Sequence, residues 1–269
     1  MTPLRLEKWE GAGNAYLLVE RDELGWPLTP AAAALLCDPR AGIGADGVLL
    51  LQAVGDRVRM TITNPDGSNS EACGNGTRMV ARWLARRAGV ADVVVETLAG
   101  DLPCTVHADG SVTATMATAA LEGPAYQPDG TTFPYLHRFV SVGNPHITIP
   151  VHDPATFPLE RDGPGLEHHA WLPQRANIEV YTVRDRTHID VRVWERGVGE
   201  TRACGSGACA VAVAAVLDEN VERTVDVRLP GGTLTIEVGD DLSIRQTGPA
   251  EAIAEIVLAD GVAARVRGR

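Results

Sequence analysis

The chain contains a single lysine, Lys8, beside 23 arginines. Enzymes that use pyridoxal phosphate hold this cofactor as a Schiff base on a lysine, and Lys8 lies in an N-terminal, strand-like stretch with no phosphate-binding loop beside it. This shortage argues against pyridoxal phosphate as a cofactor. Positive charge is scarce overall, because the formal net charge is -11. Such an acidic balance argues against nucleic acid or an anionic membrane surface as a partner.

Long hydrophobic runs and paired cysteines are also absent. No stretch reaches about 18 apolar residues, the length of a membrane-spanning helix, and the first residues, MTPLRLEKWE, lack the apolar run of a signal peptide. The five cysteines are odd in number and none shows a CxxC spacing. This usage favours a reducing compartment over a disulfide framework. We therefore expect a cytoplasmic protein, and 269 residues suffice for two compact domains.

The most informative stretch is ERGVGETRACGSGAC at residues 195–209. Cys204 precedes a GSG turn and a helix of almost only Ala and Val. The first turn of a helix leaves about four backbone N–H groups without partners and attracts anions, so a cysteine there should have a lowered pKa and be partly thiolate. The alternative is a glycine-rich turn before a buried helix with an inert core cysteine, which is favoured for one such stretch taken alone.

The chain carries this stretch twice. Residues 60–84 read MTITNPDGSNSEACGNGTRMVARWL and align with the later stretch at an offset of 131 residues. The matched pairs, at an offset of 130 or 131, are Cys73 and Cys204, Gly74 and Gly205, Asn64 and Glu195, Asn14 and Asn144, and Asp46 and Asn177. A repeat of about half the chain predicts two similar lobes. Duplication alone can repeat a core cysteine, but it does not explain polar residues nine positions before each one.

Several motifs together resemble those of the diaminopimelate epimerases, which are cofactor-independent amino-acid epimerases. They are GAGN at 11–14, GIGADG at 42–47, NPDGS and EACGNG within 64–76, GNPH at 143–146, RANIE at 175–179 and ERGVGETRACGSGA at 195–208. The resemblance covers nearly the whole chain. It departs from the family pattern at Ala15 and Tyr16, where the family usually has Asp and Phe. It implies interconversion of LL-2,6-diaminopimelate and the meso form, for lysine and peptidoglycan precursor synthesis, without a cofactor or a metal.

The resemblance also implies site residues. Cys73 and Cys204 are the expected catalytic pair. The expected substrate contacts are Asn14, Asn64, Gly74, Asn75, Asn144, Asn177, Glu195, Arg196, Gly205 and Ser206. His146 and Glu195 are expected to influence cysteine ionisation, and Arg196 suits a distal carboxylate because its guanidinium is a bidentate fork.

Inverting an amino-acid α-carbon requires removing a proton from one face and delivering one to the other. Two cysteines, one as thiolate base and one as thiol acid, supply this chemistry. Two readings compete: another cofactor-independent racemase, for example of histidine or glutamate, and a thiol-based redox or metal-binding module, against which the lack of CxxC counts. A zinc site from Cys204, Cys209 and His146 is disfavoured by its unusual spacing.

These patterns predict an α+β fold of two pseudo-symmetric lobes. Each lobe is a mixed or antiparallel β roll around a central helix, with the active site in the cleft between them. The helix after Cys204 is apolar on all sides and must be buried all round. We expect an N-terminal lobe at 1–117 with Cys73 and a C-terminal lobe at 118–269 with Cys204, the extreme C-terminus being able to cross back.

Local patterns add further expectations. Strands are predicted within 4–20, 57–63, 92–97, 103–116, 188–194 and 224–246, a helix at 29–37, and a polar, Pro-broken loop at 163–172. Arg78, Arg82 and Arg86 share one helix face, interpreted as a solvated or interlobe face, and Cys37 and Cys104 are expected in the core. The expected partner is a small amino-acid substrate, with a homodimer left open.

Overall fold

The computed structural model describes residues 3–70, 73–121 and 132–268. These residues form two compact units. The first unit contains the described residues up to Ala114 and those from Gly248 onward, and the second contains the described residues of Thr115–Thr247. Glu71 and Ala72 of the EACGNG motif, and residues 122–131 of the region where the lobe boundary was expected, lie outside the described residues. The lobe limit between 117 and 118 stays a prediction.

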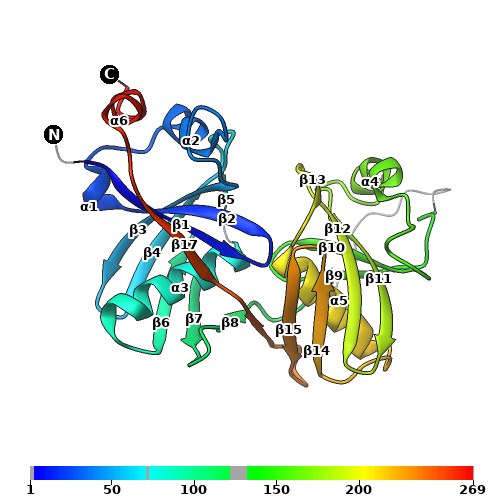
Figure 1. Cartoon of the computed structure of the whole chain (residues 1–269). Coiled ribbons are helices and arrows are strands. Elements are labelled where there is room, and N and C mark those ends of the chain that lie inside the picture. Colours follow the sequence, from blue (N-terminus) through cyan, green and yellow to red (C-terminus); the bar gives the residue numbers. More distant parts are fainter. Residues whose placement is uncertain (1–2, 71–72, 122–131, 269) are drawn as a thin grey trace. The chain divides into compact units, whose positions relative to one another are not determined.

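The first unit is a mixed sheet with helices (Figure 1). Its strands are β1 (Arg5–Gly11), β2 (Asn14–Glu20), β3 (Gly47–Val54), β4 (Arg57–Thr63), β5 (Asn69–Ser70), β6 (Asp92–Thr97), β7 (Gly100–Val106), β8 (Val112–Met116) and β17 (Glu251–Val257). Its helices are α1 (Arg21–Leu24), α2 (Pro30–Cys37), α3 (Gly74–Ala88) and α6 (Asp260–Val266). The predicted strands at 4–20 and 57–63 and the predicted helix at 29–37 are confirmed, and Thr29 caps α2 by accepting from the N–H of Ala32.

The second unit has the same kinds of element. Its strands are β9 (Arg138–Ser141), β10 (Pro145–Pro150), β11 (Asn177–Asp185), β12 (His188–Glu195), β13 (Gly199–Thr201), β14 (Thr224–Leu229), β15 (Gly232–Val238) and β16 (Ile244–Gly248). Its helices are α4 (Leu159–Glu167) and α5 (Gly205–Leu217).

The two units repeat one order of strand pairing. In the first, β1–β2 is antiparallel, β2–β3 parallel, β3–β4 antiparallel, β4–β6 parallel, and β6–β7 and β7–β8 antiparallel. In the second, the same alternation runs through β9, β10, β11, β12, β14, β15 and β16. The predicted duplication and the mixed β roll are therefore confirmed.

A helix lies inside each roll. The side chains from Ala208 to Ala215 of α5 are fully buried, and strands β9, β10, β11, β12, β14 and β15 contact this helix (Figure 1). The expectation of a helix buried on all sides is confirmed. Helix α3 contacts β1, β4, β6 and β7, but its last turn exposes Arg86 and Arg87. Each helix begins directly after one of the two repeated cysteines.

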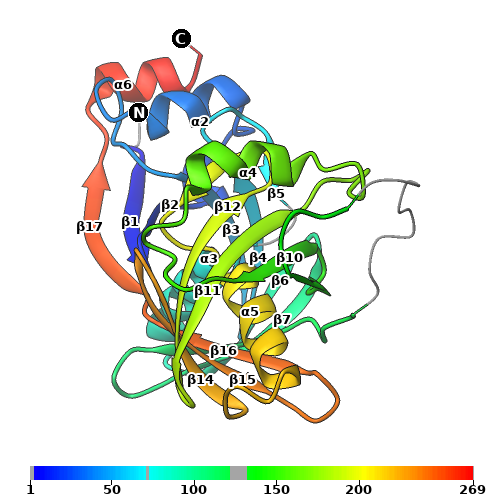
Figure 2. The same ribbon diagram turned by 90° about the vertical axis from the view of Figure 1, so that its right-hand side faces the viewer.

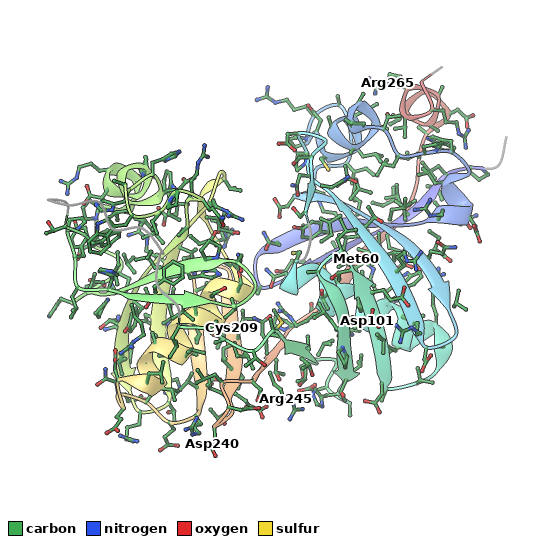
Figure 3. The ribbon with its side chains drawn as sticks, turned by 180° about the vertical axis from the view of Figure 1, so that it is seen from behind. Met60, Asp101, Cys209, Asp240, Arg245 and Arg265 are labelled. Carbon is green, nitrogen blue, oxygen red and sulfur yellow. The ribbon has the colours of Figure 1, made fainter. Side chains whose placement is uncertain are left out.

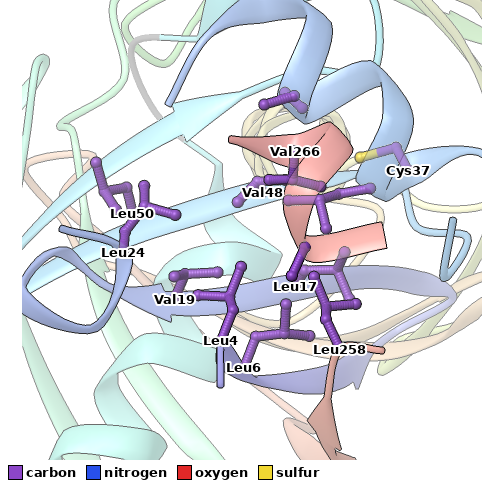
Figure 4. Packing of buried hydrophobic residues seen from close by; sticks show 14 residues of the cluster. Leu4, Leu6, Leu17, Val19, Leu24, Cys37, Val48, Leu50, Leu258 and Val266 are labelled. Atoms are coloured by element: carbon purple, nitrogen blue, oxygen red, sulfur yellow. The ribbon is translucent and has the colours of Figure 1, made fainter. Parts of the chain in front are cut away.

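A separate hydrophobic cluster completes the first unit. Helices α2 and α6 lie side by side (Figure 2), and buried residues from both ends of the chain pack beneath them (Figure 4). Leu4 and Leu6 come from the N-terminus, and Leu258 and Val266 from the C-terminus. Strand β17 pairs antiparallel with β1, so the C-terminal segment is an integral part of the first unit. Arg265, labelled in Figure 3, donates from α6 to the carbonyl of Ala41 at 3.1 Å.

Two local predictions are wrong. Helix α4 (Leu159–Glu167) takes in residues 163–167 of the loop expected at 163–172, despite Pro164. Leu159 and Leu166 bury an apolar face of this helix, and Gly163 lets the Trp194 ring approach. A Cβ at Gly163 would lie 2.6 Å from that ring. Of the two kinds of face expected for Arg78, the solvated one is wrong, since its side chain is fully buried. No helix in the described part of the chain is both long and apolar enough to cross a membrane.

Candidate active site

Cys73 is the N-cap of α3. Its backbone is extended, with φ -148° and ψ 110°, and its Sγ accepts a hydrogen bond from the N–H of Gly76 at 3.4 Å. The thiol therefore takes the place that a serine or aspartate side chain usually fills at a helix start. Its Sγ also lies 3.4 Å from the hydroxyl of Tyr16, to which it donates. Tyr16 comes from β2 and is buried, so a phenol stands beside this half-buried thiol.

A chain of polar side chains lies next to Cys73. The Nη2 of Arg78 donates to the Oδ1 of Asn75, and the Nδ2 of Asn75 donates to the Oδ1 of Asn14 at 2.6 Å. The Nδ2 of Asn14 in turn donates to the Oδ2 of Asp46 at 3.4 Å, and the same carboxylate oxygen accepts from the N–H of Ala15 at 2.8 Å. The first turn of α3 is thus tied to the start of β2, and the structure brings Asn14 and Asn75 together.

Asn64 holds its own loop. Its Nδ2 donates to the hydroxyls of Ser68 and Ser70, both at 3.0 Å, and its backbone N–H donates to the carbonyl of Ser68 at 2.8 Å. These bonds close the NPDGSNS loop that precedes Cys73. A substrate contact at Asn64 stays a prediction.

Cys204 repeats the cap geometry at the start of α5. Its φ is -134° and its ψ is 110°, and its Sγ accepts from the N–H of Gly207 at 3.4 Å. The hydroxyl of Ser206 lies 3.5 Å from this sulfur and accepts from the Nδ2 of Asn144 at 3.5 Å. Cys204, Ser206 and Asn144 therefore share one corner of the second unit.

The expected lowering of the cysteine pKa is wrong for Cys204. Burial, followed by the nearby carboxylates of Glu195 and Glu179, raises the pKa of this thiol well above its ordinary value. The hydrogen bond from the N–H of Gly207 lowers this pKa but is outweighed. Burial destabilises the thiolate by more free energy than the N–H groups of one helix N-terminus contribute to stabilising it. These surroundings favour the neutral thiol of Cys204 over its thiolate.

Glu195 lies against this thiol at the end of β12. Burial raises the pKa of its carboxyl group, while hydrogen bonds from Thr201 and Cys204 oppose the rise. The Thr201 hydroxyl donates to Oε1 at 2.5 Å. A carboxyl group whose proton affinity is raised, in contact with a thiol, is an arrangement suited to proton transfer between the two.

The imidazole of His146, on β10, lies between the buried carboxyl group of Glu179 and the side-chain amide of Asn144. Its Nδ1 lies 2.7 Å from the Oε1 of Glu179 and its Nε2 lies 3.0 Å from the Oδ1 of Asn144. His146 and Glu179 are fully buried. Gly207 makes room for the carboxylate, since a Cβ there would lie 2.8 Å from Glu179 Oε1. An influence of His146 on cysteine ionisation stays a prediction.

Asn177 and Arg196 are joined through the backbone. The Oδ1 of buried Asn177 accepts from the N–H of Arg196 at 2.9 Å, and its Nδ2 donates to the carbonyl of Pro145 at 3.1 Å. The Arg196 side chain is exposed and donates from Nη1 to the carbonyl of Gln174 at 3.1 Å. A guanidinium carries five N–H donors, so this contact leaves most of the group for a ligand.

The other cysteines lie in the core. Burial raises the pKa of Cys37 to about 11 and that of Cys104 to about 12, so both are inert thiols, as expected. Cys209 of α5, labelled in Figure 3, accepts from the Nε2 of Gln246 at 3.3 Å. Among the described residues, no three His, Cys, Asp or Glu side chains gather in a way that could hold a metal ion.

Several residues that bond to a cysteine or to another expected site residue were not predicted. They are Tyr16, Asp46, Arg78, Glu179 and Thr201. Asp46, Glu179 and Thr201 lie inside the quoted motifs GIGADG, RANIE and ERGVGET, so their position was a usable signal. The sequence contained no signal for Arg78, because it stands four residues before Arg82 and eight before Arg86, in a row typical of an exposed helix face.

Known proteins resemble this chain along its length. A sequence model of the diaminopimelate epimerase family matches residues 7–122 and 138–253. Diaminopimelate epimerase from Rhodospirillum centenum is 42% identical, over 91% of this chain and 89% of that protein. The enzyme from Desulforudis audaxviator is 42% identical, over 93% of this chain and 97% of its own length.

Solved structures share the fold at low identity. A probable proline racemase from Agrobacterium radiobacter aligns with a TM-score of 0.68 at 15% identity, covering 98% of both chains. A hydroxyproline epimerase from Agrobacterium vitis aligns with a TM-score of 0.68 at 16% identity, covering 94% of this chain and 90% of that one. The fold is that of these racemases and epimerases, and by its sequence the chain belongs to the diaminopimelate epimerase family of isomerases.

Proposed function

We propose that this enzyme interconverts LL-2,6-diaminopimelate and meso-2,6-diaminopimelate, with Cys73 and Cys204 as its acid/base pair. The observation that carries the proposal is the repeated cap, in which each cysteine is the N-cap of a helix and its sulfur accepts one backbone N–H at 3.4 Å. Family membership and relatives named for this substrate support the choice of diaminopimelate. The product serves lysine and peptidoglycan precursor synthesis.

The reacting carbon lies, in this proposal, between the two sulfurs. One thiolate removes the α-proton and the other cysteine delivers a proton to the opposite face, and the roles exchange in the reverse direction. Backbone N–H groups of Gly74, Asn75, Gly205 and Ser206 face the α-carboxylate, where they offset the charge that develops as the carbanion forms. No step needs a metal ion or an organic cofactor.

The surroundings of Cys204 favour the protonated thiol at the start of the reaction. With its pKa raised by burial and by Glu195 and Glu179, Cys204 begins as the proton donor. When the reaction runs the other way, the Glu195 carboxylate, which accepts a hydrogen bond from this thiol, takes its proton and leaves the thiolate as base. Arg196, Asn64 and Asn177 bind the distal amino-acid end of the substrate.

Exchange of the α-proton with solvent tests the function. The enzyme is incubated in heavy water with LL-diaminopimelate, histidine or glutamate, with chelator present and pyridoxal phosphate absent. We expect deuterium at the α-carbon of diaminopimelate and inversion to the meso form, and no label in the other two. Label in histidine or glutamate but not in diaminopimelate would transfer the proposal to another amino acid.

Crosslinking tests whether both cysteines serve one site. Proton donors lie about 3–3.5 Å from the atom they serve, so two thiols flanking one carbon are about 6–7 Å apart, and a small closure brings them to disulfide distance. A mild thiol oxidant, which accepts the two electrons, should join Cys73 to Cys204 in the empty enzyme, and substrate should protect. Peptide mapping that finds no such crosslink would place the thiols in separate sites.

A further inference from the structure

The polar chain beside Cys73 has a fixed direction. At one end Arg78 can only donate hydrogen bonds, and at the other the Asp46 carboxylate can only accept them. Arg78 donates to Asn75 Oδ1, which turns the Asn75 amide so that its Nδ2 donates to Asn14 Oδ1. Asp46 Oδ2 accepts from Asn14 Nδ2. Amide orientation is ambiguous from shape alone, but here both ends of the chain require the same choice.

The direction of the chain decides what Asn14 offers to a ligand. Its Oδ1 is occupied by Asn75 and one N–H of its Nδ2 by Asp46. The second N–H of that group has no partner among the described residues. Asn14 is half-buried and adjoins, through Asn75, the first turn of α3. Asn14 therefore presents a donor, which suits an anionic oxygen and rejects an ammonium group.

We propose that Arg78 and Asp46 are positioning residues that hold Asn14 as an N–H donor toward the substrate α-carboxylate. The proposal rests on the function proposed above, since it assigns the direction of one substrate contact of that site. Arg78 suits the task because it is fully buried and cannot lose its charge. Its Nε also donates to the carbonyl of Pro249 at 3.4 Å, which holds the guanidinium in place from the C-terminal segment.

The second unit reaches the same orientation by other means. The positions matching Asn75 and Arg78 are Ser206 and Cys209, so the arginine is not repeated. There Asn144 Nδ2 donates to Ser206, and Asn144 Oδ1 faces the Nε2 of His146, which Glu179 holds from its other side. In both units the asparagine Oδ1 faces a nitrogen of its own unit, and the asparagine Nδ2 donates to an oxygen of its own unit. Because different residues fix the same amide orientation in Asn14 and Asn144, we infer that this orientation is needed for function.

A double-mutant cycle tests the proposal. Arg78→Lys keeps the positive charge but loses the planar guanidinium with its several N–H donors. Asp46→Asn keeps the shape of the side chain, but the amide can donate hydrogen bonds as well as accept them. In the wild-type background we expect kcat/KM to fall about tenfold for Arg78→Lys and severalfold for Asp46→Asn, as for loss of a hydrogen bond to a charged group. In an Asn14→Ala background each change should alter kcat/KM by less than about twofold, because the residue they position is gone.

Matched controls lie nearby. Arg82→Lys changes the next arginine of α3, which donates to the carbonyl of Ala250, and Asp38→Asn changes an exposed loop carboxylate that accepts from the N–H of Arg40 and Ala41. Both should retain wild-type kcat/KM. Losses from Arg78→Lys and Asp46→Asn that are equally large with and without Asn14 would overturn the proposal and leave the two residues a structural role only.

A second measurement does not depend on any variant folding. Neutron diffraction from the deuterated wild-type protein locates the amide deuterons of Asn14 and Asn75. Deuterons of Asn75 pointing at Asn14 are expected, and the reverse orientation would overturn the proposal even if the enzyme acts on a different amino acid. Absence of α-proton exchange in the wild type would instead count against the proposed function, so the two failures are distinguishable.

Discussion

The surroundings of Cys73 and Cys204 differ although their backbone caps match. Both residues are extended N-caps whose sulfurs accept the third N–H of the following helix at 3.4 Å. Beside Cys73 stand the Tyr16 phenol and a chain that starts at a buried arginine. Beside Cys204 stand Ser206 and the carboxyl group of Glu195. Duplication has kept the helix start and replaced the side chains around it.

This difference shows that position at a helix N-terminus does not by itself set thiol ionisation. The helix dipole contributes about the same at both caps, so the unlike neighbours decide. Cys204 has two carboxylates near it and is buried, and its pKa is raised. A pair of unlike cysteines fits a reaction in which one begins as acid and the other as base.

Removing either sulfur is the largest test of the pair. Cys73→Ala and Cys204→Ala should each lower epimerisation by about a hundredfold to ten-thousandfold, the range for losing a general acid or base, while circular dichroism shows a folded protein. Cys73→Ser and Cys204→Ser keep a capping oxygen and should be nearly as inactive. Cys37→Ala and Cys104→Ala lose only packing. Near-normal turnover in either cysteine variant would break the two-base interpretation.

The next effect concerns the distal carboxylate, which Arg196 is proposed to bind. Arg196→Lys keeps the charge but loses bidentate recognition, and kcat/KM should fall about tenfold to a hundredfold. Steady-state assays in both directions measure it, with Arg175→Lys, a nearby exposed arginine, as the control. Equal efficiency of Arg196→Lys and wild type would mean that the distal group is recognised elsewhere.

The raised pKa of Cys204 predicts a loss of stability at alkaline pH. The folded state holds this proton more tightly than the unfolded chain, whose thiol has the ordinary pKa of about 8.5. The contribution of Cys204 to the free energy of unfolding is therefore complete below that pH and is lost as the pH rises toward the folded-state value. Burial gives Cys104 the same sign of dependence.

Urea unfolding from pH 7 to pH 10 measures this dependence. Cys204→Ser does not titrate in that range, so its stability should fall less steeply above about pH 8.5 than that of the wild type. Cys104→Ala should flatten the curve in the same direction. Parallel curves for wild type and Cys204→Ser would show that the thiol is not held protonated by its surroundings.

The smallest expected effect comes from the hydroxyl of Tyr16. In the second unit the position that matches Tyr16 is His146, so the two cysteines have different neighbours here. Tyr16→Phe removes the hydroxyl 3.4 Å from Cys73 Sγ and should change kcat by about twofold to tenfold, the value of one neutral hydrogen bond. The pH dependence of kcat should shift with it. Tyr181→Phe, a buried tyrosine of the second unit, is the control. An unchanged pH profile in Tyr16→Phe would show that the phenol only packs.

The parts of the fold that depend on local pattern were predictable. The all-apolar sequence after Cys204 predicted the buried helix, and the helix expected at 29–37 is found as α2. The parts that depend on distant packing were not. Pro164 and Gly163 disfavour a helix locally, yet burial of Leu159 and Leu166 overrides them.

The site shows the same division. The position of each cysteine at a helix start could be predicted, because in the sequence each one directly precedes a glycine-rich turn and a helical stretch. The raised pKa of Cys204 does not follow, because Glu179 is brought to it by β11 from 25 positions earlier and burial is a property of the whole unit. The solvated alternative for Arg78 is wrong because Asn75 and Pro249 accept its hydrogen bonds in the interior, and neither contact can be read from the helical spacing of the arginines.

The return of the C-terminal segment to the first unit has a consequence for synthesis on the ribosome. The second unit is continuous in sequence and has all its strands once Gly248 has emerged. The first unit must wait for β17, which pairs with β1, and for Leu258 and Val266, which complete its hydrophobic cluster. The unit that is begun first is therefore completed last, and one edge of β1 stays unpaired until β17 has been made.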